Sequence, residues 1–308
     1  MDQSKSALLP KVGERLWLDD SDAFKARQAA TNDPLLIEHA QHLHEHGFVH
    51  LKGVISEAVI NKAVAAYKQW CDNLDDDPRT IRGDGRNPRV VNLHGDREEF
   101  KSLFTSSPDF LRVLDYLMGY RASVYTSLTF EFGTEQPLHR DTPVFRTEPQ
   151  EFYYGVWFAL EDADESNGCL QVLKGGHKDG RVDPFEFARS RIVSQEDIEP
   201  SAGPLWAPYQ NALVAKCREE GCPLELLPAK KGDVIIWHPQ LPHGGSPIND
   251  PDRTRMSTVY HVVPEGVPVY QADVFFNPDA KPERKTSFKY ANYDGREFVQ
   301  KVANVGKN

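Results

Sequence analysis

Hydrophobic residues recur at helical spacing in the first third of the chain and alternate with polar residues in much of the remainder. A spacing of three and four residues places apolar side chains on one face of a helix. Helices are therefore predicted from Pro34 to Gly47, from Ser56 to Cys71 and from Ser107 to Gly119, each with residues typical of helix caps. Residues 48–51 form a predicted short strand between the first two helices.

Strand periodicity begins near residue 121. Residues 124–132 alternate between two faces, one of which is apolar except for Thr126. Residues 152–160, 233–237 and 255–263 are short, densely apolar segments bounded by turn residues. Helices followed by many short strands predict an α+β protein in which a helical layer packs on an all-β core.

Three segments depart from this pattern. Residues 1–32 are polar and mixed in charge, which predicts an extended N-terminal arm before a single domain over residues 33–308. Residues 75–98 carry acidic residues, arginines, glycines and prolines, and residues 178–231 are proline-rich with a helix predicted near 210–220. Long insertions in a compact domain are often binding loops, so both are predicted to be lids, with solvated loops as the alternative.

The net charge narrows the class of partner. The chain carries 36 Lys and Arg against 46 Asp and Glu, a formal charge of −10, which disfavours nucleic-acid and membrane partners and leaves a small-molecule substrate. Its four cysteines form no CxxC pair, and the first residues lack the apolar segment of a signal peptide. A cytoplasmic protein with reduced thiols is expected. Nothing in the sequence specifies an oligomeric state.

A candidate metal site begins with His139-Arg140-Asp141. In an extended segment, residues two apart share a face, so the imidazole and the carboxylate can reach one ion. His243 lies 102 positions after Asp141, and a β-core that folds back on itself can place it beside the pair. Two imidazoles and a carboxylate are the facial triad typical of non-haem Fe(II). His238 is the alternative for the third ligand.

A candidate anion site follows twelve positions after His243, where Arg255 and Ser257 share one face of a predicted strand. A guanidinium and a hydroxyl side by side suit a carboxylate. A dicarboxylate that chelates iron needs such a partner at its far end, because an unpaired buried carboxylate is costly.

In this order, the segments HxD, GDVIIWHPQLPHGGSP and RxS resemble the phytanoyl-CoA dioxygenase (PhyH-like) family of Fe(II)/2-oxoglutarate-dependent dioxygenases. GFVHLKGVIS at 47–56 and VWFALEDADESNGCLQVLKGGHKDG at 156–180 resemble it too. The resemblance runs from about residue 35 to 265, without the insertion after Gly180. It implies a double-stranded β-helix (jelly-roll, cupin-like) core with the N-terminal helices packed on one face.

The resemblance also implies roles for individual residues. His139, Asp141 and His243 would bind Fe(II), and Arg255 with Ser257 would bind the cosubstrate 2-oxoglutarate, with Arg253 as the competing anchor. Three further positions are predicted near the cosubstrate, each with a purely structural role as the alternative: Trp157, Thr126 and Arg89.

The implied reaction is oxidation of an unactivated C–H bond of a small-molecule metabolite by O₂, with release of succinate and CO₂. Because the sequence retains Asp141, where related halogenases have a small residue, hydroxylation is predicted over halogenation, with desaturation or ring formation also open. Two other functions remain open: a cupin-like Zn or Mn hydrolase or isomerase, which would give Arg255 and Ser257 no necessary task, and a non-catalytic jelly-roll binding protein.

Overall fold

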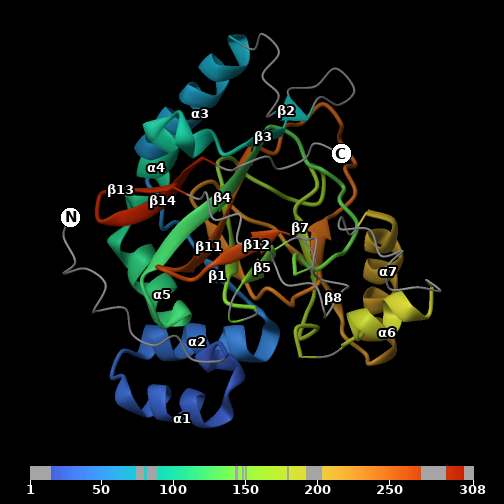
Figure 1. Ribbon diagram of the computed structural model, residues 1–308. Helices are drawn as coiled ribbons and strands as arrows, with labels where there is room; N and C mark the ends of the chain where they lie inside the picture. The colour runs from blue at the N-terminus through green and yellow to red at the C-terminus, as the bar shows by residue number, and fades with distance from the viewer. Residues whose placement is uncertain are drawn as a thin grey trace.

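Two facing sheets, antiparallel except where β14 pairs with β4, form the centre of the molecule (Figure 1). The computed structural model describes residues 15–73, 80–81, 89–142, 145–147, 149, 151–178, 180–191, 203–271 and 289–301. The strands of the large sheet, in spatial order, are β1 (Phe48–Leu51), β9 (Val234–Trp237), β6 (Tyr154–Ala159), β11 (Ser257–Pro264), β4 (Ala122–Phe130), β14 (Arg296–Lys301) and β13 (Lys289–Tyr293), with β3 (Arg89–Val91) paired to β4 and β2 (Thr80–Ile81) paired to β3.

The small sheet runs in the order β10 (His243–Gly245), β7 (Leu170–Leu173) and β8 (Leu224–Leu227), and β12 (Val269–Gln271) pairs with β5 (Phe145–Thr147). One apolar cluster joins the two sheets, because it combines Trp157, Ile235 and Val259 of the large sheet with Leu170 and Leu227 of the small one. This arrangement confirms the predicted α+β class and the jelly-roll core.

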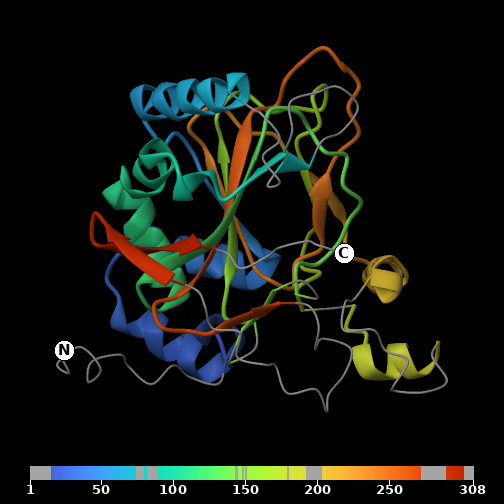
Figure 2. The ribbon, with the colours of Figure 1, turned by 45° about the horizontal axis from the view of Figure 1, so that its top comes forward.

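Helices cover the outer face of the large sheet (Figures 1 and 2). They are α1 (Ser21–Ala30), α2 (Pro34–His46), α3 (Glu57–Asp72), α4 (Glu98–Thr105) and α5 (Pro108–Met118), with short 3-10 turns η2 (Trp17–Asp19) and η3 (Leu93–Gly95). Both faces of β4 and β11 are therefore largely buried. Two more helices, α6 (Pro184–Arg189) and α7 (Gly203–Glu219), lie on the opposite side of the molecule from α3, α4 and α5 (Figures 1 and 2).

Local capping chemistry explains where the predicted helices begin and end. The Asp33 carboxylate accepts backbone N–H bonds from the first turn of α2, and Gly47 ends that helix with φ +85°. Ser107 and Gly119 do the same for α5. Ser56 occupies the N-cap of α3 but makes no side-chain cap bond. The three predicted helices are confirmed.

The prediction of an extended arm over residues 1–32 is wrong for its described part, residues 15–32. Asp20 caps α1 through its side chain, and Trp17 Nε1 donates a hydrogen bond to Leu117 O at 2.8 Å. Helix α1 buries no residue of its own, so its sequence shows little of the apolar stripe that reveals a helix. Leu16 and Leu18, which precede α1, are buried in the core and attach this N-terminal segment to it.

The two predicted insertions are also smaller than expected. Strand β3 and turn η3 belong to the main fold rather than to a loop over 75–98, and β8 is a full member of the small sheet although it lies within 178–231. Both strands were missed because they are short and lie in stretches otherwise rich in charged residues, glycine and proline, which mask their periodicity. The predicted helix near 210–220 is confirmed as part of α7. Residues 74–79, 82–88 and 192–202 lie outside the described residues.

Within the described ranges, no helix combines the length and apolarity that crossing a bilayer requires.

Replacing Gly155 by alanine is expected to destabilise the fold by about 1–3 kcal/mol, the usual cost of overpacking. A Cβ on Gly155, in β6, would collide with the indole ring of Trp237 on the neighbouring strand β9. Urea denaturation monitored by circular dichroism measures the effect. Gly95→Ala is the matched control, because a Cβ there meets only Gln300 O at an ordinary 3.7 Å. Equal stability of the two variants would contradict this packing.

Candidate metal and cosubstrate site

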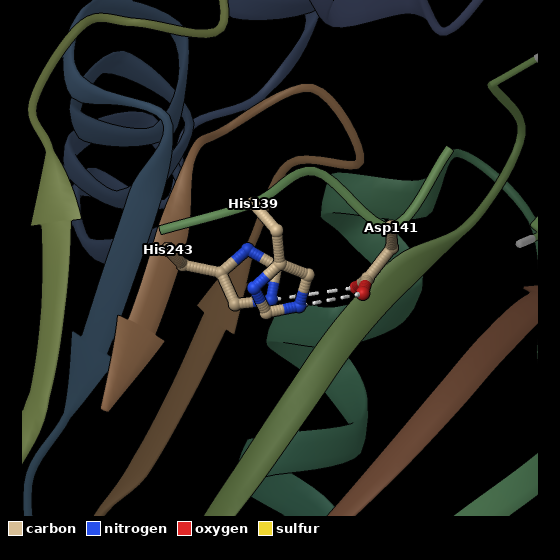
Figure 3. Close-up of side chains that lie close together, drawn as sticks. All are labelled: His139, Asp141 and His243. Carbon is tan, nitrogen blue, oxygen red and sulfur yellow. Dashed lines mark ion pairs between the residues drawn. The ribbon is translucent and has the colours of Figure 1, made fainter. Parts of the chain in front are cut away.

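Three side chains from two segments distant in sequence converge at the edge of the small sheet (Figure 3). His139 and His243 form an isolated antiparallel bridge, with N–O distances of 2.9 and 3.0 Å in the two directions. Asp141 follows two positions after His139 and points to the same side. One ligand atom from each residue lies within 4.8 Å of the other two. The pairing of β10 with residue 139 thus brings the predicted triad together.

Backbone carbonyls fix the orientation of both imidazoles. Nδ1 of His139 donates to Pro137 O, and Nδ1 of His243 donates to Leu241 O, each at 2.9 Å. Nε2 of each ring then keeps its lone pair and lies 3.5 Å from an oxygen of Asp141. Nε2 of His139 also accepts a bond from Gln136 Nε2 at 3.0 Å. Imidazoles held in this way are prepared to bind a metal through Nε2.

The protonation states suit a divalent cation. Burial alone would raise the pKa of Asp141, but the facing imidazoles of His243 and His261, the hydrogen bond from His261 and the contact with His139 hold it well below its usual range. Burial lowers the pKa of His243 to about 4. At neutral pH the site therefore offers an ionised carboxylate and a neutral imidazole, the forms that bind metals.

Two further residues hold Asp141 in place. Trp237 Nε1 donates to Asp141 Oδ2 at 3.3 Å, and Nε2 of His261 lies 3.1 Å from the same oxygen. Sequence reasoning missed both residues. His261 had a usable signal, since it continues on β11 the alternation that begins at Arg255 and Ser257.

Arg255 and Ser257 are fully buried next to the apolar cluster between the sheets. One guanidinium nitrogen of Arg255 donates to Gly168 O at 2.8 Å, and the guanidinium carbon lies 5.8 Å from the centre of the Trp157 ring. Arg255 Nε and Ser257 Oγ have no hydrogen-bond partner among the described residues. Burial lowers the pKa of Arg255 to about 10, so the side chain is still cationic at neutral pH. A buried cation beside an unpartnered hydroxyl is a fitting receptor for a carboxylate.

Arg253 and His238, the alternatives for the anion anchor and the third metal ligand, are paired with other side chains. Arg253 binds both carboxylate oxygens of Asp164, at 2.9 and 3.0 Å, and is more than one-third exposed. His238 lies 3.1 Å from Asp19 Oδ2 and is not a member of the triad cluster. The geometry therefore favours Arg255 and His243 at the two positions.

The remaining predicted residues lie on the same sheet. Thr126 on β4 pairs with His261, and its hydroxyl donates to Asn92 Oδ1 at 3.0 Å. Arg89 is half-buried, its guanidinium carbon lies 5.9 Å from the centre of the Phe130 ring, and its Nε has no partner within the part of the chain that the structure describes. Burial lowers the pKa of Arg89. Thr126 is thus engaged within the fold, whereas Arg89 retains an unused buried donor.

A sequence profile of the phytanoyl-CoA dioxygenase (PhyH) family matches residues 43–257, which include the triad and Arg255. The chain belongs to the phytanoyl-CoA dioxygenase family. Peroxisomal phytanoyl-CoA dioxygenase of Rattus norvegicus is 24% identical over 233 residues, covering 69% of this chain and 64% of the relative. Phytanoyl-CoA dioxygenase domain-containing protein 1 of Mus musculus is 26% identical over 196 residues, covering 60% of each. The chain thus spans less than two thirds of the length of these family members.

Solved structures share the fold. The epimerase SnoN, in complex with Fe3+, alpha ketoglutarate and nogalamycin RO, superposes with a TM-score of 0.61 at 19% identity, covering 87% of this chain and 100% of SnoN. EctD from S. alaskensis, with 2-oxoglutarate and 5-hydroxyectoine, gives 0.59 at 15% identity and covers 82% of this chain and 87% of EctD. The carbocyclase SnoK gives 0.59 at 20% identity, covering 75% and 84%.

Proposed function

We propose that this PhyH-family protein is an Fe(II)- and 2-oxoglutarate-dependent dioxygenase that hydroxylates a C–H bond of a small-molecule metabolite. The observation that carries the proposal is the convergence of two oriented imidazoles and one ionised carboxylate, in a protein that also buries an arginine and a serine whose donors lack partners among the described residues. In the overall reaction, R–H, O₂ and 2-oxoglutarate give R–OH, succinate and CO₂.

His139, Asp141 and His243 are proposed to hold the iron. Their donor set of two imidazole nitrogens and one carboxylate oxygen is the one that non-haem Fe(II) oxygenases use. Bound Fe(II) supplies the activation of O₂, driven by oxidative decarboxylation of the keto acid. Trp237 and His261 hold the Asp141 carboxylate in place for the ion.

Arg255 and Ser257 are proposed to bind the distal carboxylate of 2-oxoglutarate. Arg255 Nε and Ser257 Oγ would each gain a partner, which they lack among the described residues. Trp157 packs beside the guanidinium and excludes water from it, which strengthens the ion pair. We propose secondary roles for Thr126, in placing His261, and for Arg89, in binding an anionic group of a ligand.

Hydroxylation is the specific part of the proposal. The printed descriptions of SnoN and SnoK name an epimerase and a carbocyclase, and that of EctD names 5-hydroxyectoine, so one fold serves several outcomes. Asp141 occupies a ligand position and leaves no place for a halide ligand in that role.

We also propose a cytoplasmic location, because Cys71, Cys169, Cys217 and Cys222 are all free thiols.

Succinate formation tests the proposal. Protein loaded anaerobically with Fe(II) is supplied with O₂, 2-oxoglutarate and a panel of metabolites, and succinate is measured by mass spectrometry with 18O₂ as tracer. The proposal requires that a panel member stimulate succinate release and gain one 18O atom. Turnover that needs neither O₂ nor 2-oxoglutarate, and that Zn²⁺ supports equally well, would favour the hydrolase or isomerase instead.

A further inference from the structure

Helix α7 packs directly against the motif that carries two of the three candidate metal ligands. The side chains that face the motif or the adjoining core recur at intervals of four, three and four residues: Trp206, Gln210, Leu213 and Cys217. This spacing forms one stripe along the helix. Helix α7 lies within residues 178–231, so a segment expected to form a lid is instead joined to the metal motif.

Gln210 makes the closest of these contacts. Its Oε1 accepts a hydrogen bond from the backbone N–H of Arg140, and its Nε2 donates to the carbonyl of the same residue, both at 2.9 Å. The amide thus satisfies both backbone groups of Arg140, as a neighbouring strand would. Gln210 and Arg140 are each only 3% exposed, so water cannot readily replace these bonds.

Arg140 stands between His139 and Asp141, and its neighbours on both sides carry ligand atoms. The main chain of His139 is held by His243, whereas the main chain of Arg140 is held by Gln210. The Arg140 side chain adds a bond to Gly176 O at 2.6 Å. A rotation of the Arg140 peptide groups would change the directions of the His139 and Asp141 side chains relative to His243.

We propose that Gln210 is a positioning residue for the metal site, and that α7 keeps His139 and Asp141 in metal-binding geometry through it. The inference rests on the proposed metal-binding function. Without the amide, two buried backbone groups lose their partners, and the peptide must rotate to find others. Substitutions at the partners of metal ligands typically weaken metal binding 10–100-fold.

Titration of the metal-free protein with Co(II), followed by calorimetry, tests the inference. Gln210→Met keeps the side-chain length but makes neither bond, so its dissociation constant is expected to rise about 10–100-fold. Asn211→Met is the matched control, since Asn211 is an exposed amide at the next position of the same helix. It is expected to bind Co(II) within about twofold of the unsubstituted protein. A merely structural role for Gln210 would lower the melting temperature of the metal-free protein and leave the dissociation constant unchanged.

A second pair keeps the test decisive if Gln210→Met does not fold. Gln210→Glu retains the acceptor for Arg140 N–H and loses the donor to Arg140 O, and Asn211→Glu controls for the added charge. Weaker Co(II) binding by Gln210→Glu than by Asn211→Glu supports the inference. If either folded Gln210 variant binds Co(II) as tightly as its Asn211 control, the inference is overturned and the proposed function is left intact. Failure of the unsubstituted protein to bind Co(II) overturns both.

Discussion

Replacing His243 by alanine is expected to abolish 2-oxoglutarate turnover and to weaken Fe(II) binding by more than about 100-fold, beyond the effect of losing a residue that only supports a ligand. The variant keeps one imidazole and one carboxylate, and it loses the ligand that β10 brings to the HxD motif. Metal affinity is measured anaerobically by competition with a chelator, and turnover by succinate release.

His238→Ala is the matched control for this variant. His238 is a buried histidine five positions earlier in the same segment, and its ring faces Asp19 rather than Asp141. Removing the His238 ring leaves the Asp19 carboxylate without that partner. The variant is therefore expected to be less stable to unfolding but to bind the metal with unchanged affinity. Retained metal affinity in His243→Ala, or its loss in His238→Ala, would contradict the proposed ligand set.

Replacing Arg255 by methionine is expected to weaken 2-oxoglutarate binding by about 2–5 kcal/mol, or roughly 30- to 4,000-fold. This guanidinium is a buried cation that binds the Gly168 carbonyl, and its Nε is without a partner in the described ranges. An apolar side chain of similar size is therefore expected to leave the free fold unchanged or more stable. Opposite effects on cosubstrate binding and on stability are characteristic of a residue kept for a ligand.

The experiment combines thermal denaturation without ligand and anaerobic titration of the Fe(II) protein with 2-oxoglutarate. Arg253→Met is the control, because Arg253 pairs with Asp164 at the surface and is expected to leave 2-oxoglutarate affinity unchanged. If Arg253→Met loses affinity and Arg255→Met keeps it, the anchor has been assigned to the wrong arginine.

Local chemistry made the fold class and several helices predictable. Asp33 with Gly47, and Ser107 with Gly119, define helix ends through contacts within a few residues, and these boundaries are confirmed. Helix α1 was missed because its attachment depends on contacts of the preceding segment, such as the bond from Trp17 to a carbonyl 100 positions away. Such a contact leaves no periodic signal in the local sequence.

In the candidate site, too, only the features that depend on neighbouring residues could be predicted. The spacing of HxD and of RxS could be read directly, because residues two apart share a face of an extended chain. The supports of the site could not be read: His261 meets Asp141 across 120 positions, and Gln210 meets Arg140 across 70. Only the pairing of strands and the docking of α7 bring these groups together, so their roles become visible only in three dimensions.

The absorption spectrum of the Fe(II) protein with 2-oxoglutarate, recorded without O₂, tests the central claim most directly. If His139, Asp141 and His243 hold iron and Arg255 holds the far carboxylate, adding 2-oxoglutarate produces a visible metal-to-ligand charge-transfer band. That band should be absent from the His139→Ala/Asp141→Ala double variant and should need far more 2-oxoglutarate in Arg255→Met. No band in the unsubstituted protein, or an unchanged band in the double variant, would contradict the account.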